Sequence, residues 1–200
     1  NLTTIYENTI YKLKREKMKL LLTTLLTISL GFTSTWNSIH SEEASNTKLE
    51  VVSSTIERTE INFEIDGFHL VPVNTPQGSM MKVQLEDGAS LLEAGAPDLQ
   101  KFSRSIIIPD NKQMALKVIS AEYVDYENIH IAPSKGNLTR SVNPAEIPFE
   151  FGSVYEQNIF FPGDIAQLGV PYILRDLRGV TVEFTPFQYN PVQQKLRVYS

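Results

Sequence analysis

Along much of this chain apolar residues alternate with polar ones, and this period of two constrains the fold more than any other feature. Ile61, Phe63 and Ile65, for example, alternate with two polar residues. Successive side chains of a β-strand point to opposite faces, so the alternation predicts strands with one buried and one exposed face, as in antiparallel sheets. The pattern recurs in four further runs: Met81, Val83 and Leu85; Met114, Leu116 and Val118; Val180, Val182 and Phe184; and Leu196 and Val198.

Turn-forming residues separate the alternating runs, and clusters of Asp, Asn, Gly and Pro favour tight connections between strands. A sustained helical period is missing, and the best helical candidates are short, at residues 90–93 and 164–168. We therefore predict an all-β fold, an antiparallel two-sheet β-sandwich with little helix. The turn sequences are Asp66-Gly67, residues 74–78, 86–88 and 109–111, and Asn190-Pro191.

Residues 1–40 differ from the rest in charge and hydropathy. They carry five basic against two acidic residues, a net charge of +3, and the basic cluster is followed by an apolar run at residues 20–32. A basic region, a short apolar region and a small polar exit predict a signal-peptide helix with an upstream segment, and Met18 is the natural start. The apolar run is shorter than the roughly 20 residues of a membrane span. An uncleaved anchor is the alternative, because no clear Ala-x-Ala site is present.

Composition narrows the function of the remainder. The chain contains no cysteine, which excludes a disulfide, a thiolate metal site and a cysteine nucleophile within it. Residues 41–200 carry 13 basic and 21 acidic residues, a net charge of −8, and so acidic a chain is not expected to bind nucleic acid. We interpret residues 41–48 as a polar linker and residues 49–200 as the folded domain.

No catalytic or metal-binding arrangement is evident. His40, His69 and His130 lie far apart without ligand spacing, and a structural role is favoured for the latter two. Asp125 and Glu127 would share a strand face, where they could act in acid–base chemistry or bind a hard cation. A solvated strand edge is the favoured interpretation of this pair. We predict no catalytic residue, no metal and no cofactor for this chain.

The most unusual stretch is residues 131–152, which read IAPSKGNLTRSVNPAEIPFEFG. Its prolines cannot join a central strand, so we predict a loop that projects from the sheets. Lys135 and Arg140 stand isolated on this loop in an acidic domain. A projecting loop with one long cation suits the cleft of a trypsin-like or arginine-specific protease. The alternative is an ordinary surface loop with solvated charges.

Several strings in the sequence resemble those of a known family. They are GAPDL at residues 95–99, IAPSKG at 131–136 with Thr139-Arg140, IPFEFG at 147–152, FFPG at 160–163 and PYILRDLRGVTVEFTPFQYNPV at 171–192. In this order and spacing they resemble the N-terminal propeptide of gingipain-type cysteine peptidases. The resemblance covers residues 49–200.

The resemblance implies a β-sandwich propeptide that assists the folding of a cysteine endopeptidase and blocks its active site until it is cleaved. The catalytic domain would follow Ser200, so this chain would be a C-terminally truncated fragment of the precursor and no enzyme itself. Its partners would be the cognate protease domain, in cis, and the bacterial secretion machinery. The protein would be exported by way of the periplasm of a Gram-negative bacterium and then secreted or held at the cell surface. It would contact the membrane only during export.

The family also implies a basic loop residue near the specificity pocket of the protease. Arg140 matches this place best, with Ser141 after it at a candidate cleavage point, and Lys135 is the second choice. Within residues 171–192 we predict Arg–carboxylate pairing around Arg175, Asp176 and Arg178. The rival hypothesis is a secreted β-sandwich binding or adhesion module with no protease attached.

Overall fold

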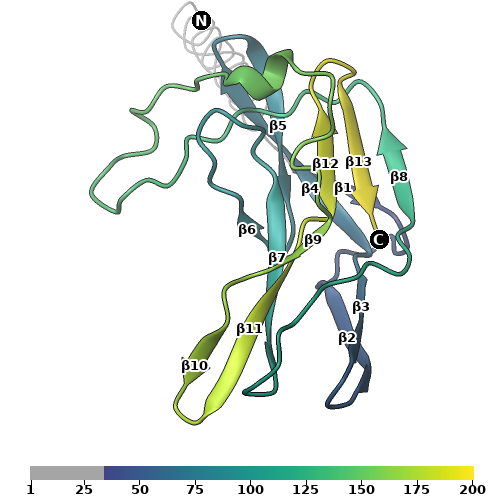
Figure 1. The fold of residues 1–200 in the computed structure, drawn as a ribbon. Coiled ribbons are helices and arrows are strands. Elements are labelled where there is room, and N and C mark those ends of the chain that lie inside the picture. Colours follow the sequence, from purple (N-terminus) through teal and green to yellow (C-terminus); the bar gives the residue numbers. More distant parts are fainter. Residues whose placement is uncertain (1–33) are drawn as a thin grey trace, which may run out of the picture. The chain divides into compact units, whose positions relative to one another are not determined.

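The computed structural model of the chain describes residues 34–200, and the strands found there are drawn in Figure 1. The predicted signal-peptide sequence before residue 34, including Met18, lies outside the described residues. The elements in chain order are β1 (Thr35–Ser38), β2 (Lys48–Ser54), β3 (Thr59–Glu64), β4 (Gly67–Thr75), β5 (Gly78–Gln84), β6 (Ala89–Ser90), β7 (Gln100–Ile107), β8 (Tyr123–Tyr126), the 3-10 helix η1 (Ser153–Glu156), β9 (Ala166–Leu168), β10 (Tyr172–Leu174), β11 (Leu177–Phe184), β12 (Phe187–Asn190) and β13 (Lys195–Tyr199).

The strands form antiparallel sheets, which confirms the all-β prediction. The orders are β1-β4-β5, β12-β13-β8, the two-stranded β2-β3, and β10-β11-β7-β6, in which β9 also pairs with β11. The first two sheets share one apolar core, because Phe68 of β4 packs edge-on against Phe187 of β12 and Tyr126 of β8, with ring centroids 5.4 and 5.2 Å apart. Burial of such aromatic side chains dominates the stability of a sandwich core.

The predicted alternation is visible in burial. Val180 and Val182 of β11 are buried, and the residues between and after them, Thr181 and Glu183, are only partly covered. The predicted strand at 114–118 was wrong, since these residues pair with no strand among the described residues. Alternation shows which faces a strand would have, but a strand also needs a neighbour to bond with.

Both predicted helices were also wrong. Ser90 belongs to β6, and residues 166–168 form β9, where Leu168 pairs with Val182 and Ala166 with Phe184. Pairing with β11 satisfies the backbone groups of this segment and covers its apolar side chains, which outweighs a weak local helical preference.

Strand β1 lies inside the range assigned to targeting. Its four residues pair with β4, Trp36 opposite His69 with ring centroids 5.0 Å apart. The indole also lies over Gly67, where a Cβ atom would clash with the ring. The described fold therefore includes residues that precede the predicted boundary at residue 40.

The polar segment at 41–48 is fastened to the fold rather than free along its length. Lys48 Nζ and Ser45 Oγ both donate to the buried carboxylate of Asp66, at 2.8 and 2.5 Å. The bond from Lys48, and to a smaller extent that from Ser45, lowers the pKa of Asp66 below its ordinary value.

Candidate functional site

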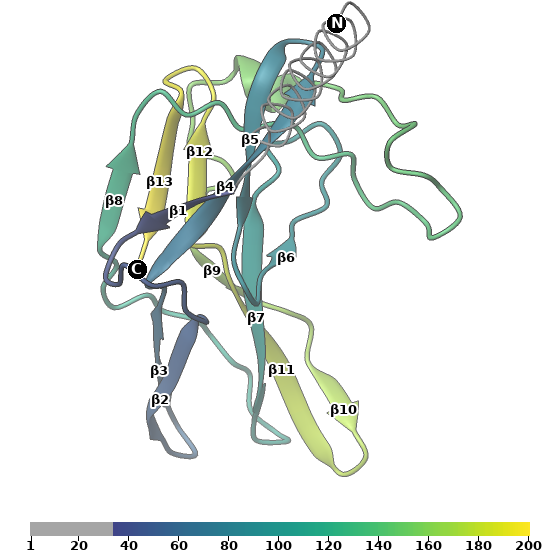
Figure 2. The ribbon, with the colours of Figure 1, turned by 180° about the vertical axis from the view of Figure 1, so that it is seen from behind.

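Residues 135–151, which we call the arginine loop, leave the described fold as a long irregular excursion, drawn in green in Figures 1 and 2. This agrees with the loop predicted from its prolines, apart from its first residues. Residues 131–134 are buried and bridge two parts of the structure, with Ile131 beside Met81 and Pro133 beside Pro97. The loop thus starts from the core.

One residue closes the base of the loop from both sides. Gly95 N donates to Ser134 O at 2.9 Å, and Gly95 O accepts from Gly152 N at 2.8 Å. The two ends of the loop are therefore bonded to the same residue. Gly95 has a φ of +78°, and a Cβ atom there would lie 3.1 Å from Gly152 N, so glycine suits this position on both counts.

Lys135 has a structural task at the start of the loop. Its Nζ donates to Pro144 O at 2.7 Å and lies 4.2 Å from the centre of the Phe149 ring. A cation above an aromatic face is attracted to it. Lys135 therefore links the outgoing and returning arms of the loop.

Arg140 lies in a tight turn farther along. Val142 N donates to Thr139 O at 3.0 Å, which closes the turn around Arg140 and Ser141, and the Thr139 and Ser141 hydroxyls are 3.0 Å apart. Arg140 is exposed and has no hydrogen-bond or ion-pair partner within residues 34–200. A second turn follows, with Glu146 N donating to Asn143 O at 3.1 Å. The structure thus holds Lys135 within the loop and presents Arg140 to solvent.

Asp125 and Glu127 belong to an ion-pair network on β8 and β13. Arg197 donates to both Asp125 oxygens, at 2.8 and 3.0 Å, and Lys195 lies 2.9 Å from Glu127. The bonds from Arg197 lower the pKa of Asp125. Both carboxylates are thus held by cations at the edge strand β8, and Asp125 is half-buried in this network rather than solvated as predicted, whereas Glu127 is exposed. The residues that the structure describes include no group of three His, Asp or Glu side chains placed to hold a metal ion.

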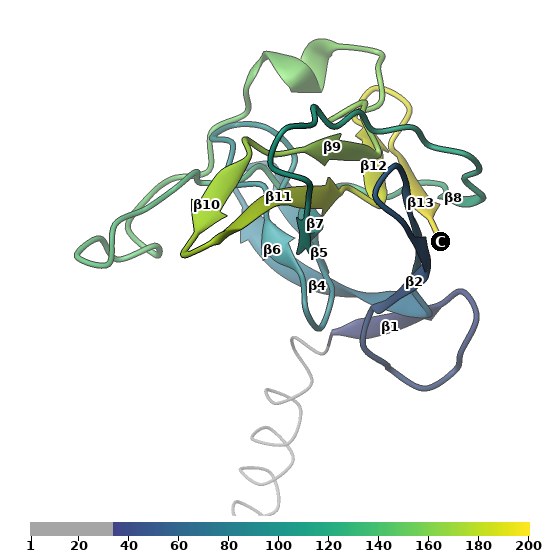
Figure 3. The same ribbon diagram turned by 60° about the horizontal axis from the view of Figure 1, so that its bottom comes forward.

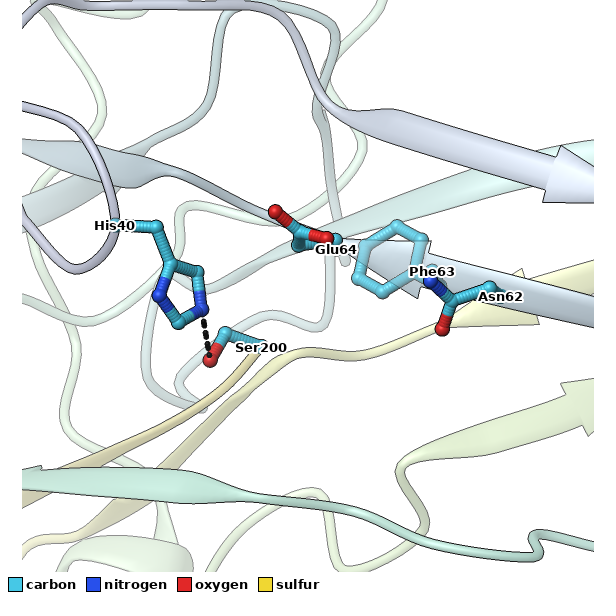
Figure 4. A pocket seen from close by; sticks show the side chains of 5 residues that line it. All are labelled: His40, Asn62, Phe63, Glu64 and Ser200. Carbon is cyan, nitrogen blue, oxygen red and sulfur yellow. Dashed lines mark hydrogen bonds between the residues drawn. The ribbon is translucent and has the colours of Figure 1, made fainter.

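A second place resembles a catalytic pair and fails on geometry. His40 Nε2 is 3.1 Å from Ser200 Oγ beside a cavity of about 420 Å³, and Figure 4 draws this bond between the two. A histidine base needs a third group to orient its ring. Glu64 lines the same cavity, but its carboxylate accepts from Lys48 Nζ at 3.4 Å. Within the described residues no carboxylate is bonded to the His40 ring.

The predicted pairing around Arg175 was wrong. Arg178 Nη1 donates to the carbonyl oxygens of Pro109 and Lys112, at 2.8 and 2.7 Å, and no ion pair joins Arg175 or Arg178 to a carboxylate within residues 34–200. No helix in the described part is long and apolar enough to cross a membrane.

The base of the loop has a signal in the sequence. The strings at 95–99, 131–136 and 147–152, which carry the family resemblance, are brought together by the structure at Gly95, Ser134 and Gly152. The glycines in two of these strings are the signal, since Gly95 and Gly152 meet where a Cβ atom would be tightly packed against the other residue's backbone.

Comparison with known proteins gives consistent matches. The family model described as Propeptide_C25 matches residues 40–200. Gingipain R1 of Porphyromonas gingivalis is 42% identical over 142 residues, 71% of this chain and 14% of that protein. Gingipain R2 of the same species is 36% identical over 159 residues, 80% of this chain and 22% of that protein. The chain thus spans less than a quarter of the curated relatives it matches.

Two solved structures share the fold. The complex of Porphyromonas gingivalis RgpB pro- and mature domains matches with a TM-score of 0.74 and 36% identity, over 78% of this chain and 82% of that one. A structure described as an insight into zymogenic latency of gingipain K, also from Porphyromonas gingivalis, matches with a TM-score of 0.71 over 84% of this chain and 94% of that one. At 18% identity the second match shows a common fold alone.

Proposed function

The chain belongs to the Propeptide_C25 family of gingipain-type propeptides, and we propose that it keeps a cysteine endopeptidase of the same precursor inactive by inserting Arg140 into its specificity pocket. The propeptide identity follows from the family match and from the likeness to a pro-domain at 36% identity. The inhibitory contact and the residue that makes it are our proposal.

The observation that carries the proposal is the position of Arg140. It stands in a closed turn on a projecting loop, exposed and without a partner in the described residues, while both ends of that loop are fastened at Gly95. A fixed base lowers the entropy lost when the loop is captured. A guanidinium that meets a carboxylate in a pocket forms charge-assisted, often bidentate, hydrogen bonds.

Lys135, the second candidate, is better understood as a brace. Inserting it into a pocket would break its bond to Pro144 O and remove its ammonium from the Phe149 ring. Arg140 loses no such contact. We therefore assign the pocket to Arg140 and a positioning role to Lys135.

The turn around Arg140 also suits a regulated release. A basic residue held in the specificity pocket of a protease places the following peptide bond, here that before Ser141, beside the nucleophile. Cleavage after Arg140 would cut the loop between its two anchored ends and weaken the inhibitor. Assistance in folding of the peptidase, export through the periplasm and secretion or surface attachment complete the proposal, and all rest on family membership.

The direct test is inhibition of a mature gingipain-type peptidase, and gingipain R1 of Porphyromonas gingivalis is a suitable probe. We expect the full chain to inhibit hydrolysis of a short arginyl substrate competitively, because the loop and the substrate would share one pocket. Absence of inhibition at micromolar concentrations of the chain would contradict the proposal.

The rival hypothesis, an adhesion module, is tested separately by reading the coding sequence beyond Ser200. A domain with a cysteine and histidine there supports the propeptide function, and further sandwich repeats or a stop codon support the rival.

A further inference from the structure

The distal part of the β10–β11 hairpin carries a bare apolar face. Leu174 pairs directly with Leu177, and Gly179 pairs with both Tyr172 and Ile107. Residues paired across antiparallel strands point to the same side, and so do residues two apart along one strand. Ile107, Tyr172, Leu174 and Leu177 therefore share one face, which we call the hairpin face.

This face is unusually exposed for its composition. The exposed fractions are 68% for Ile107, 66% for Leu174 and 48% for Leu177. The Tyr172 ring packs against Gly179, 3.0 Å from where a Cβ atom would stand, and Tyr172 is itself 38% exposed. Contiguous apolar patches of this kind mark interaction sites, whereas single exposed apolar residues do not.

The opposite side of the hairpin is braced at Arg178, and beside it carries one exposed apolar residue, Ile173, which is paired with Arg178 and 76% exposed. Arg178 points there, since its strand neighbour Leu177 points to the hairpin face, and its guanidinium donates to two carbonyl oxygens of the turn at residues 109–112. A two-stranded hairpin alone is marginal in water. The brace holds the hairpin in place and leaves its apolar face uncovered.

The hairpin and the arginine loop extend to the same side of the described fold. Both lie at the left in Figures 1 and 3 and at the right in Figure 2, whereas the β2–β3 hairpin lies apart from them. A body large enough to enclose Arg140 and its turn would therefore approach the hairpin too. The tip of the hairpin sets Arg175 beside Asp176, so it offers no basic cluster for an anionic membrane.

We propose that the hairpin face is a second docking surface for the same peptidase domain, and that it binds an apolar patch of that domain away from the active site. The inference rests on the proposed function, since the loop contact identifies the partner. It adds an attachment that does not depend on the specificity pocket. The chain would thus remain bound when the pocket is filled or the loop is cut.

A binding measurement with a blocked peptidase separates the two contacts. Mature gingipain R1 is treated with an arginyl chloromethyl ketone, which occupies the pocket, and binding of the full chain is measured by biolayer interferometry. We expect wild type and Arg140→Ala to bind the blocked peptidase equally well. The double variant Leu174→Asp, Leu177→Asp should bind it at least about tenfold more weakly.

The matched control is Val51→Asp, Val52→Asp on β2, two apolar residues with comparable exposed fractions of 51% and 58% on the other hairpin. It should bind like wild type. Leu177→Thr keeps a strand-forming residue and should also weaken binding. This milder variant tests the hairpin face even if the double variant fails to fold.

Three results would overturn the inference. The first is that wild type inhibits the free peptidase yet does not bind the blocked one. The second is that the leucine variants bind the blocked peptidase as wild type does. The third is that wild type self-associates in sedimentation and the leucine variants abolish this without affecting peptidase binding, which would assign the face to a second copy. Failure of wild type to inhibit the free peptidase would instead contradict the proposed function.

Discussion

The arginine loop and the β10–β11 hairpin both project from the described fold, and both carry an exposed arginine in a turn, Arg140 and Arg175. They are built differently. The loop has no strand pairing and depends on closure at Gly95 and on the Lys135 brace. The hairpin is regular, with paired residues and an exposed apolar face.

The difference indicates what each projection can offer a partner. An irregular loop with a fixed base presents one side chain at a defined position, which suits a deep pocket. A paired hairpin presents area and few polar groups, which suits a shallow apolar surface. Specific charge and buried area are complementary contributions to binding, because area alone sets neither affinity nor specificity.

The largest expected effect is that of Arg140→Ala. Removal of a guanidinium from a desolvated pocket should weaken inhibition of gingipain R1 by at least about 30-fold, about 2 kcal/mol. The inhibition constant of Arg140→Lys should lie between those of wild type and Arg140→Ala, because an ammonium keeps the charge but loses the bidentate geometry. Inhibition constants with a short substrate measure this. Lys112→Ala, at an exposed turn outside the loop, is the control, and equal constants for the two alanine variants would refute the loop assignment.

Gly95→Ala tests whether the base of the loop matters. A Cβ atom at φ +78° and 3.1 Å from Gly152 N strains the closure, so we expect inhibition about tenfold weaker and a lower melting temperature. Gly78→Ala is a matched control, because Gly78 has a φ of +110° with nothing within 4 Å of its Cβ position. It should lower the melting temperature and leave inhibition unchanged. Equal inhibition by both variants would show that closure at Gly95 does not position Arg140.

Lys135→Met should weaken inhibition about threefold without changing the melting temperature. Methionine keeps the length of the side chain but removes the bond to Pro144 O and the attraction to the Phe149 ring, so the loop samples more conformations before binding. Lys117→Met, at an exposed position outside the loop, is the control. A loss as large as that of Arg140→Ala would identify Lys135 as the residue in the pocket.

Arg175→Ala should have the smallest effect, at most about a twofold change in the inhibition constant. Its φ of +59° is equally unfavourable for arginine and alanine, so the turn should not change. The same inhibition assay measures it. If this variant lost more inhibition than Arg140→Ala, the roles of the two projections would be reversed.

Sequence alone predicted the strands whose one face is buried. Runs such as 180–184 and 196–198 alternate because the core covers every second side chain. The same rule failed at 114–118, which alternates without a partner strand, and missed β1, whose Thr, Trp, Asn and Ser residues resemble a polar exit more than a strand. Whether a segment forms a strand depends on a second segment that pairs with it, and the local sequence of the first segment does not reveal that partner.

For the candidate site, sequence predicted a projecting loop and both of its cations, because prolines and isolated charges are local signals. These local signals did not rank the two cations, and only the family resemblance put Arg140 first. What distinguishes Lys135 from Arg140 is contact with Phe149 and Pro144 on the returning arm, which only the folded loop brings close. The closure at Gly95 was equally hidden, since it joins residues from three separate segments.

The most direct test of the central claim is a crystal structure of the full chain bound to a mature gingipain-type peptidase. We predict that the arginine loop enters the active site and that the Arg140 guanidinium occupies the specificity pocket within hydrogen-bond distance of a carboxylate. A complex in which another residue fills the pocket, or in which the active site is empty, would contradict the account.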